Sequence, residues 1–348
     1  MKKFFALFCM AFSIYIPLHA AVSGSTEWRA IPQFSEIPSA DEAGIVLQDR
    51  IIPFPKFRYI FNPSLIKKKD GYLLAIREVF PGTGWPIPQS NISLWTLDED
   101  FQRIDQGTTL KLIDDYSEDP RLFNVGDALY LSYHHVTNTP TDWKVEIALS
   151  RLDPQVLETF YTTALMFSES RRVEKNWVPF TIQQGDGKEE LYFVYSYNPF
   201  KVLRCVDERI GAVELCHNGG LLPILSTWEN KFGLIRGGTP AIRLENGEYL
   251  AFFHTFQGYS NYAMGAIVFE ASPFRITKIS PYPILYPGVY DSQEGYGSRA
   301  IIFPGGLVED TDEADGDVLH IACGVNDVGV KIVTVDKEAL LNSLIPVE

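Results

Sequence analysis

Short apolar strand patterns, separated by glycine turns, recur along most of the chain. Five segments share one layout, in which a proline is followed by a polar turn and then by a strongly apolar, aromatic run. They read FNPSLIKKKDGYLLAIREV, EDPRLFNVGDALYLSYHHV, NWVPFTIQQGDGKEELYFVYSY, GGTPAIRLENGEYLAFFHTF and IIFPGGLVEDTDEADGDVLHIACGV. Their prolines are Pro63, Pro120, Pro179, Pro240 and Pro304, at intervals of 57, 59, 61 and 64 residues. A repeat of this length with glycine turns at matched offsets is typical of a propeller blade.

Each repeat continues into a third strand pattern and usually a fourth. The third patterns read NISLWTLDED, VEIALSRLDP, KVLRCVDE, YAMGAIVFEA and VGVKIVTVD. DG, NG and GD turns between them indicate hairpins, and long amphipathic helical patterns are absent from the sequence. The pattern therefore predicts an all-β fold, a five-bladed β-propeller with four-stranded blades that start near residues 58, 115, 174, 235 and 297. Because the last repeat has only three strands, we expect residues 43–50 to supply its fourth strand and close the ring.

The N-terminus has the three parts of a secretory signal peptide. MKK is followed by the apolar run FFALFCMAFSIYIPL and by the small-residue stretch HAAVSGS. We expect residues 1–21 to be removed, which would leave one propeller domain over residues 22–348 in the periplasm or outside the cell. The alternative is a retained N-terminal anchor. The run is short for a membrane span and no second apolar stretch follows, so no stable membrane insertion is expected after cleavage.

Composition narrows the partners and the redox chemistry. The chain is 46% hydrophobic and carries a formal charge of −14, which argues against nucleic acid and against an anionic membrane surface as partners. Cys205 and Cys216 are the best-placed pair for a disulfide in an exported protein, and the alternative is that they and Cys323 are small buried apolar residues. No spacing of cysteine and histidine indicates zinc, so neither a metal nor a cofactor is expected.

The five prolines should bring polar residues together. Because the innermost strand of every blade lines the central channel, the residues beside the prolines are expected to converge on one ligand site. These residues are Asn62, Glu118, Asp119, Arg121, Lys175, Asn176, Arg236 and Arg299. Two carboxylates and a guanidinium in EDPR could serve acid chemistry or bind a polyhydroxylated ligand. The alternative is a structural ion pair, in which Arg121 would neutralise a neighbouring carboxylate.

In these five motifs, taken in order, the chain resembles glycoside hydrolase family 130 over roughly residues 58–343. The family contains five-bladed propeller phosphorylases and hydrolases of β-mannosides, and β-1,2-mannosyltransferases are related to it. EDPR is the most specific element of the resemblance. The resemblance implies that Asp119 is the catalytic acid, which acts on the glycosidic oxygen through a sugar hydroxyl, with Arg121 as its neighbour in the motif. It further implies that Asp327 holds the non-reducing-end sugar and that Asn62, Arg77, Lys175 and His254 line subsites.

The choice of reaction depends on the acceptor. Family phosphorylases bind phosphate with several basic side chains, whereas the stretch LSYHHVTNTPTDW offers histidines and no obvious arginine. Together with the expected export, this favours inverting hydrolysis of β-mannosides or related oligosaccharides. Hydrolysis needs a second carboxylate roughly 6.5 to 9.5 Å from the acid to activate water, and Glu174 and Glu294 are the candidates. A phosphorylase, a β-mannosyltransferase and a catalytically silent carbohydrate-binding propeller are the alternatives.

Three further features have open interpretations. His134 and His135 alternate across a strand, so at most one can face the channel, and a packing role is equally open to either. The run EDTDEADGD lacks the spacing of a calcium loop and is expected to be a solvated hairpin tip. Trp85 could stack on a sugar or pack within its loop.

Because an arginine partner would lower the pKa of a catalytic acid, Arg121 is not expected to be the tightest partner of Asp119.

Overall fold

The computed structural model describes residues 40, 43–55, 59–80, 89–113, 116–138, 143–257, 262–285, 301–312 and 316–347. The expected signal peptide, Trp85, Glu294 and Arg299 lie outside the described residues. Among the residues that are described, no helix is long and apolar enough to cross a membrane.

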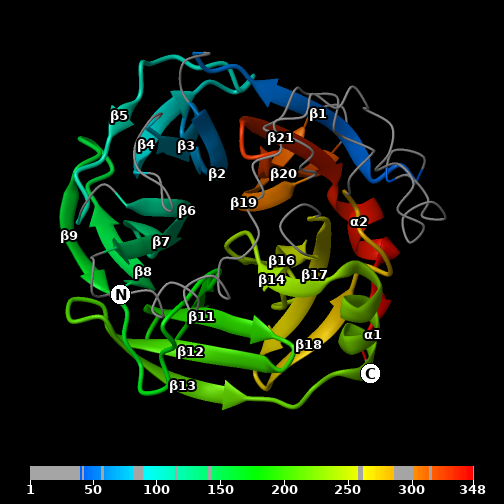
Figure 1. Ribbon diagram of the computed structural model, residues 1–348. Coiled ribbons are helices and arrows are strands. Elements are labelled where there is room, and N and C mark those ends of the chain that lie inside the picture. The colour runs from blue at the N-terminus through cyan, green and yellow to red at the C-terminus, as the bar shows by residue number, and fades with distance from the viewer. Residues whose placement is uncertain are drawn as a thin grey trace, which may run out of the picture.

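Five antiparallel sheets radiate around one central axis, so the predicted five-bladed propeller is confirmed (Figure 1). Blade 1 contains β2 (Tyr59–Lys68), β3 (Gly71–Val79), β4 (Ser90–Leu97) and β5 (Thr108–Thr109). Blade 2 contains β6 (Ser117–Val125), β7 (Ala128–Asn138), β8 (Trp143–Leu152) and β9 (Thr159–Ala164). Blade 3 contains β10 (Val178–Gln183), β11 (Glu189–Tyr197), β12 (Phe200–Asp207) and β13 (Ala212–Asn218).

Blade 4 departs from the four-strand layout. Its innermost position is divided between β14 (Leu234–Gly237) and β15 (Ile242–Arg243), which both pair with β16 (Tyr249–Phe256). β17 (Met264–Ala271) and β18 (Phe274–Ile279) follow, and β22 (Ile345–Pro346) from the end of the chain adds to the outer edge. The split leaves residues 238–241 between two pieces of one strand, and the backbone N–H of Ala241 donates to the carbonyl of Pro179 in blade 3 at 2.9 Å.

Blade 5 joins the two ends of the described chain. It contains β19 (Ile302–Asp312), β20 (Gly316–Val325) and β21 (Gly329–Asp336), and β1 (Val46–Ile52) pairs antiparallel with β21 as the fourth strand. This confirms the prediction that the segment near residues 43–50 closes the ring. Lys331 on β21 forms an ion pair with Asp49 on β1. Closure removes the open edge that an unpaired β21 would otherwise present.

Three of the five prolines lie at bulges of the innermost strands, whereas Pro179 lies in a regular ladder and Pro240 lies between β14 and β15. The ladder between β2 and β3 shifts at Asn62 and Pro63, the ladder between β6 and β7 at Asp119 and Pro120, and the ladder between β19 and β20 at Gly305. Proline lacks the N–H that a regular ladder needs, and a bulge also redirects the neighbouring side chain. In blades 1, 2 and 5 the proline therefore marks a place where the innermost strand can direct a polar residue out of the ladder.

The apolar core is divided among the interfaces between adjacent blades. Leu73 of blade 1 and Leu131 of blade 2 belong to one buried cluster, and Phe180 of blade 3 packs edge-on against Phe269 of blade 4 with centroids 5.2 Å apart. Ile66, Leu122, Pro179, Pro240 and Leu307, one from each blade, line a common central cavity of about 290 Å³. The five innermost strands thus face one channel, as the proline repeat predicts.

Two helices stand among the described residues. α1 (Pro223–Phe232) begins with proline in its first turn and buries Leu225, Trp228 and Phe232, whose spacing is helical. The Trp228 ring packs edge-on against Phe253 of blade 4. α2 (Lys337–Ser343) begins after the capping residue Asp336, which accepts the N–H of Ala339. Neither helix was expected from the sequence, since both are too short to show a long amphipathic pattern.

The cysteines are all free among the described residues, so the suggested pairing of Cys205 with Cys216 is wrong. Both lie on neighbouring strands of blade 3, but Cys205 is opposite Val213 in the ladder, three positions before Cys216. Three residues of strand span about 10 Å, which exceeds the reach of a disulfide. Cys323 is buried on β20, as the alternative expects, whereas Cys205 is half-buried and Cys216 is exposed.

Candidate active site

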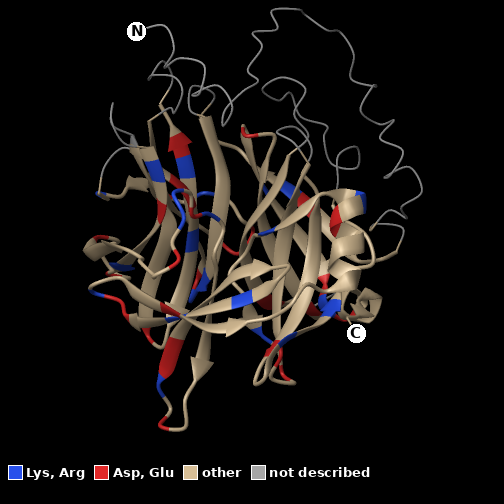
Figure 2. Cartoon of the chain, turned by 60° about the horizontal axis from the view of Figure 1, so that its bottom comes forward, with Lys and Arg blue, Asp and Glu red and all other residues tan. Residues whose placement is uncertain are grey.

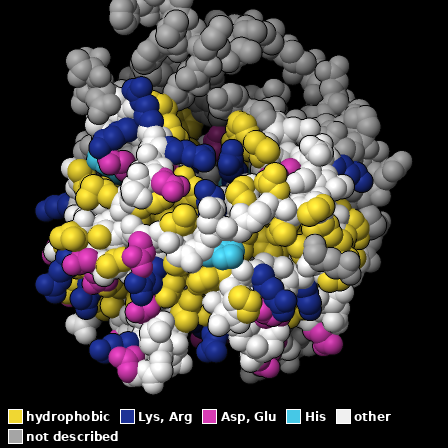
Figure 3. Space-filling model, turned by 90° about the horizontal axis from the view of Figure 1, so that it is seen from below, with side chains coloured by type: hydrophobic (Ala, Val, Ile, Leu, Met, Phe, Trp, Pro, Cys, Tyr) yellow, Lys and Arg dark blue, Asp and Glu magenta, His cyan; other side chains and the backbone are white. Residues whose placement is uncertain are grey.

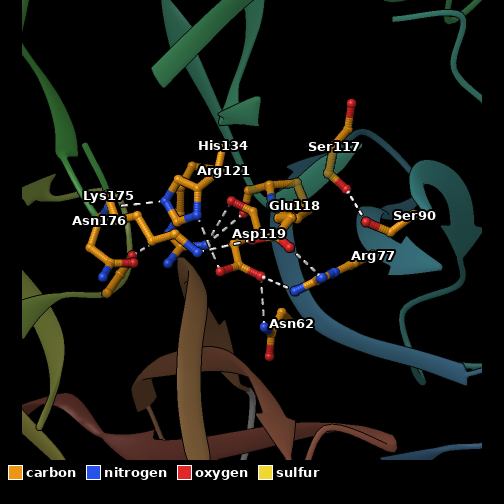
Figure 4. Close-up of polar contacts among 12 residues, drawn as sticks. Asn62, Arg77, Ser90, Ser117, Glu118, Asp119, Arg121, His134, Lys175 and Asn176 are labelled. Carbon is orange, nitrogen blue, oxygen red and sulfur yellow. Dashed lines mark hydrogen bonds and ion pairs between the residues drawn. The ribbon is translucent and has the colours of Figure 1, made fainter. Parts of the chain in front are cut away.

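Asp119 lies at the centre of a buried polar cluster at the bulge of β6 (Figure 4). Its backbone has a φ of 52°, in the left-handed region that costs a residue other than glycine about 1 to 3 kcal/mol. Asn62, at the matching bulge of β2, has a φ of 49°. The Asn62 side-chain amide donates to Asp119 Oδ1 at 2.7 Å. The strained backbone of two blades thus brings a donor and an acceptor together.

Two cationic side chains from neighbouring blades hold the carboxylates of EDPR. Arg77 on β3 donates to Glu118 Oε1 at 2.5 Å and lies 3.5 Å from Asp119 Oδ1. Lys175, just before β10, donates to Glu118 Oε2 at 3.0 Å, and its side chain is 37% exposed. Arg77 also lies over the ring of Phe61. Blades 1, 2 and 3 therefore meet through an ion-pair network around two adjacent buried acids.

His134 on β7 approaches Asp119 from the other side. Its Nδ1 lies 3.3 Å from Asp119 Oδ2, and its Nε2 accepts the backbone N–H of Asn176 at 2.9 Å. The Nδ1 contact is longer and less well aligned than a full hydrogen bond. Asn176 is itself held in the left-handed region, with a φ of 62°. His134, only 3% exposed, thus connects Asp119 to the start of blade 3.

The network sets the protonation of both acids. Burial alone would raise the pKa of Asp119, but the hydrogen bond from His134, followed by the charges of Arg77 and Lys175, holds that pKa well below its usual range. Burial likewise opposes ionisation of Glu118, and Arg77 and Lys175 still lower its pKa. Burial lowers the pKa of His134. At neutral pH the site therefore contains two carboxylates and a neutral imidazole.

Arg121 does not pair with the carboxylate of Asp119. Its guanidinium donates to the backbone carbonyl of Gly238 and, at 2.8 Å, to that of Pro120, and it lies over the ring of Phe303 at 5.0 Å. Burial lowers its pKa to about 10. This agrees with the expectation that Arg121 is not the tightest partner of Asp119. Arg121 thus connects blade 2 with blades 4 and 5. The cations that face the two carboxylates of EDPR are Arg77 and Lys175, from other segments.

The blade 4 side of the site contains a buried histidine and an exposed arginine. His254 on β16 stacks on Tyr262, with centroids 5.4 Å apart, and burial together with the charge of Arg121 lowers its pKa to about 3. Arg236 on β14 lies opposite His254 in the ladder and is exposed. Within the described ranges Arg236 makes no ion pair with a carboxylate. It is therefore available to an anionic ligand.

Asp327 belongs to the same electrostatic environment. It lies in the turn between β20 and β21 with a φ of 55°, and its charge, after those of Glu118 and Asp119, raises the pKa of Arg77. Of the candidate residues from the sequence that are described, the structure thus brings together Asn62, Arg77, Glu118, Asp119, Arg121, Lys175, Asn176, Arg236, His254 and Asp327.

Glu174, the other candidate for a catalytic carboxylate, lies beside this network. Its carboxylate accepts the indole N–H of Trp177 at 3.2 Å, the hydroxyl of Tyr195 at 3.4 Å and the backbone N–H of Arg171. Burial raises its pKa. These contacts hold Glu174 against the interface of blades 2 and 3, and none of them reaches Asp119. The second candidate base, Glu294, is outside the described residues.

Glu118, Asp119 and His134 also satisfy the geometry of a metal site, since their donor atoms lie within 4.8 Å of one another. The same carboxylates are contacted by the positive charges of Arg77 and Lys175. A metal ion would have to compete with both for the same oxygen atoms. We therefore assign these donors to ion pairs and proton chemistry.

Sequence reasoning did not decide between His134 and His135. Alternation along β7 allows only one of them to face Asp119, and the register decides which, because His134 is opposite Glu118 and His135 is opposite Ser117. The bulge at Asp119 and Pro120 sets that register. No sequence signal short of the pairing itself would have distinguished them.

Comparison with known proteins agrees with this geometry. A family model described as β-1,4-mannooligosaccharide phosphorylase, in glycoside hydrolase family 130, matches residues 109–345. The chain belongs to glycoside hydrolase family 130. It is therefore a glycosidase-like enzyme of a mannoside-acting family, as the motifs predicted. The matched region contains Asp119, His134 and Lys175, whereas blade 1 with Asn62 and Arg77 precedes it.

Individual relatives are more distant. The chain is similar to beta-mannosyltransferase 2 of Komagataella phaffii, with 38% identity over 77 residues, 22% of this chain and 11% of that protein. Beta-mannosyltransferase 3 of the same organism is 36% identical over 74 residues, 20% of this chain and 10% of that protein. The alignments thus span about a tenth of the length of these curated relatives.

Solved structures share the fold at low identity. A beta-1,2-mannobiose phosphorylase from Listeria innocua has a TM-score of 0.61 at 16% identity, covering 87% of this chain and 97% of that one. A mannose phosphorylase from Leishmania mexicana, in complex with phosphate, has a TM-score of 0.60 at 14% identity, covering 87% and 92%. These likenesses establish the propeller architecture.

Proposed function

We propose that the chain is an inverting β-mannoside phosphorylase that can also run in the synthetic direction. The observation that carries this proposal is the composition of the Asp119 site. Glu118 is held by Arg77 and Lys175, and Glu174 is bound to Trp177 and Tyr195. Glu118 and Glu174 are therefore already engaged by these donors, which disfavours either one as the base that activates water opposite Asp119. Phosphate is already anionic and needs no such base.

The charges around the channel support an anionic acceptor. Arg236 is exposed without an ion pair among the described residues, Lys175 is partly exposed, and neutral His254 lies beside Arg236 in the ladder. Figure 2 shows acidic and basic positions inside the ring as well as at the hairpin tips. On the side of the molecule in Figure 3, Lys and Arg are interspersed with Asp and Glu. The basic groups of the site thus act locally, against a net charge of −14.

The proposed reaction conserves its atoms and charges. An oxygen of HPO₄²⁻ forms a bond to the anomeric carbon while the bond from that carbon to the glycosidic oxygen breaks. Asp119 is ionised before the substrates bind, so it first takes up one proton from solvent. That proton passes to the leaving oxygen through a sugar hydroxyl, and the bound sugar phosphate then returns a proton to Asp119. Inversion converts a β-mannoside into α-mannose 1-phosphate. In the reverse direction, ionised Asp119 is the base that takes the proton of the acceptor hydroxyl.

The names of relatives support both phosphorolysis and its reverse, mannosyl transfer. The family model and the structures from Listeria innocua and Leishmania mexicana are phosphorylases by description, and the Komagataella proteins are β-mannosyltransferases. A phosphorylase that runs in reverse transfers mannose to an acceptor. One site with an acid–base residue and an anion-binding rim would serve both directions.

The deciding experiment incubates the purified protein with β-linked manno-oligosaccharides, with and without phosphate, and identifies the products. We expect α-mannose 1-phosphate that appears only with phosphate, and glycan extension from α-mannose 1-phosphate in its absence. Free mannose in equal yield with and without phosphate would establish a hydrolase instead. Unchanged glycans that bind measurably would identify a carbohydrate-binding propeller.

Hydrolysis remains the second candidate because of the N-terminal sequence. The signal-peptide pattern over residues 1–21 favours export, where phosphate and sugar phosphates are scarce. We propose export on that pattern alone. Fractionation of cells and N-terminal sequencing of the product should find a new N-terminus near Ala20 or Ala21 outside the cytoplasm, and an unprocessed Met1 in the membrane fraction would contradict it.

A further inference from the structure

We propose that His134 is a positioning residue that presents its Nδ1–H to Asp119 Oδ2 and thereby assigns Oδ2 as the oxygen that exchanges the catalytic proton. The inference rests on the proposed function only in giving Asp119 an acid–base role. The arrangement of hydrogen bonds around His134 is independent of the substrate.

The tautomer of His134 follows from its two contacts. A backbone N–H can only donate, so the Asn176 amide 2.9 Å from Nε2 requires a lone pair on that nitrogen. A neutral imidazole with a lone pair on Nε2 carries its hydrogen on Nδ1. Nδ1 is buried, and Asp119 Oδ2 lies 3.3 Å from it. Without that acceptor, the N–H would be an unsatisfied buried donor.

The two oxygens of Asp119 then differ. Oδ1 receives the Asn62 amide at 2.7 Å and faces the Arg77 guanidinium at 3.5 Å, so both of its lone-pair directions have donors. Oδ2 has His134 as its only partner among the described residues, which leaves one direction open. A transferable proton can bind only where no donor already points. The geometry therefore selects Oδ2 and the direction opposite His134.

Several charges surround this pair. Asp119 is faced by Arg77 from β3, Glu118 from β6 and Lys175 from the segment before β10. His134 is influenced by Asp119, Lys175 and Glu118. The charges of Asp119 and His134 also influence the pKa of His254 on β16. All of these surrounding groups remain in the two His134 variants below, so a change in the titration of Asp119 in those variants reports the loss of the His134 donor.

Two substitutions separate the two ends of the imidazole. His134→Asn keeps an N–H donor the same number of bonds from Cα as Nδ1, but loses the acceptor for Asn176. His134→Gln keeps an acceptor at the distance of Nε2 and loses the donor to Asp119. If His134 positions the proton, His134→Gln should lower kcat about 10-fold to 100-fold, a part of what general acid–base catalysis contributes. His134→Asn should remain within about fivefold of the wild-type kcat. Equal losses, or a greater loss in His134→Asn, would overturn the proposal in favour of a structural link to blade 3.

The pH profile gives a second readout that a structural role would not move. Loss of a donor raises the pKa of Asp119, so the profile of kcat/KM should shift to higher pH in His134→Gln and not in His134→Asn. The shift is to higher pH in both directions of the reaction. It moves the alkaline limb of the phosphorolysis profile, where Asp119 is the acid, and the acid limb of the synthesis profile, where Asp119 is the base. His135→Asn, on the opposite face of β7, is the matched control. It should leave the pH profile in place whatever it does to stability.

A spectroscopic measurement separates this proposal from the proposed function. In the wild-type protein labelled with ¹⁵N-histidine, His134 should show a neutral ring with hydrogen on Nδ1 at neutral pH, and Asp119→Asn should shift its Nδ1 resonance. A hydrogen on Nε2, or no response to Asp119→Asn, would overturn the inference even in an active enzyme. Conversely, if no β-mannoside reacts and the Nδ1–H tautomer is observed, the proposed function fails and the coupling of His134 to Asp119 stands.

Discussion

Asn62 and Asp119 occupy matching positions in neighbouring blades and are joined side chain to side chain. Each precedes a proline at the bulge of its innermost strand, and their φ values of 49° and 52° are nearly the same. The amide of Asn62 donates to Asp119 Oδ1 at 2.7 Å. The same backbone device, repeated 57 residues apart, thus aims a donor and an acid at one point. Strain of this kind concentrates at functional sites.

Asp119→Asn should remove the acid–base group and keep the shape of the side chain. We expect the turnover of β-mannosides to fall by about 10² to 10⁴. The free energy of unfolding should change by less than about 2 kcal/mol, because Arg77 retains Glu118 and asparagine tolerates a left-handed backbone. Steady-state kinetics and denaturant unfolding test both. An unfolded variant whose folded fraction keeps full specific activity would instead identify EDPR as a structural motif.

Asn62→Ala should reduce activity through the loss of one donor to Asp119. A hydrogen bond to a charged group contributes about 1.5 to 3 kcal/mol, so we expect a loss of about 10-fold to 100-fold in kcat/KM. Asn62→Gly is the control for backbone strain, since glycine adopts a positive φ freely. It should be more stable than Asn62→Ala and equally slow. If Asn62→Gly is more active than Asn62→Ala, the left-handed backbone of residue 62, and not its side-chain amide, is what supports activity.

Arg77→Met should destabilise the protein at neutral pH. The variant leaves Asp119 without a contacting cation and Glu118 with Lys175 alone, and removal of one partner of a buried ion pair costs about 3 to 5 kcal/mol. In the wild type the lowered pKa values of both acids stabilise the fold above the unfolded pKa near 4, and this contribution is lost as pH falls through the folded values.

The pH dependence should therefore change with Arg77→Met. Without the guanidinium, burial raises the pKa of both acids, so the stability gap between variant and wild type should narrow between pH values of about 7 and 5. Urea unfolding at the two pH values measures it. Arg204→Met, which removes an exposed pair with Glu214, is the control and should cost less than about 1 kcal/mol at either pH. A constant gap for Arg77→Met would argue against charge as the cause.

Arg236→Met should weaken phosphate binding and leave the chemistry intact. We expect the KM for phosphate to rise about tenfold, which corresponds to about 1.4 kcal/mol, with a smaller change in kcat. Arg243→Met on β15 of the same blade is the control, since Arg243 is exposed away from His254 in the ladder. Phosphorolysis rates over a range of phosphate concentrations give both constants. Equal KM values for phosphate in the two variants would show that Arg236 does not bind the phosphate.

The sequence determined the architecture because its signals are local and repeated. Alternating strands, glycine turns and five prolines at near-constant intervals define five blades, and the missing strand of the last blade points to the segment near residues 43–50 as its closure. Placement of innermost strands around one axis then brings distant polar residues together. Asn62, Asp119 and Lys175 could be assigned to one site before any contact was known.

The tertiary structure decided which partners each of these residues has. Side chains alternate across a strand, so a single bulged residue reverses every assignment that follows it. For this reason the register of β6 and β7, and not the sequence, places His134 beside Asp119 and His135 away from it. Packing between blades likewise places the Arg121 guanidinium on the backbone carbonyl of Gly238 and the Arg77 guanidinium beside both acids. These contacts of Arg121 and Arg77 join residues more than 40 positions apart, and no local pattern encodes their geometry.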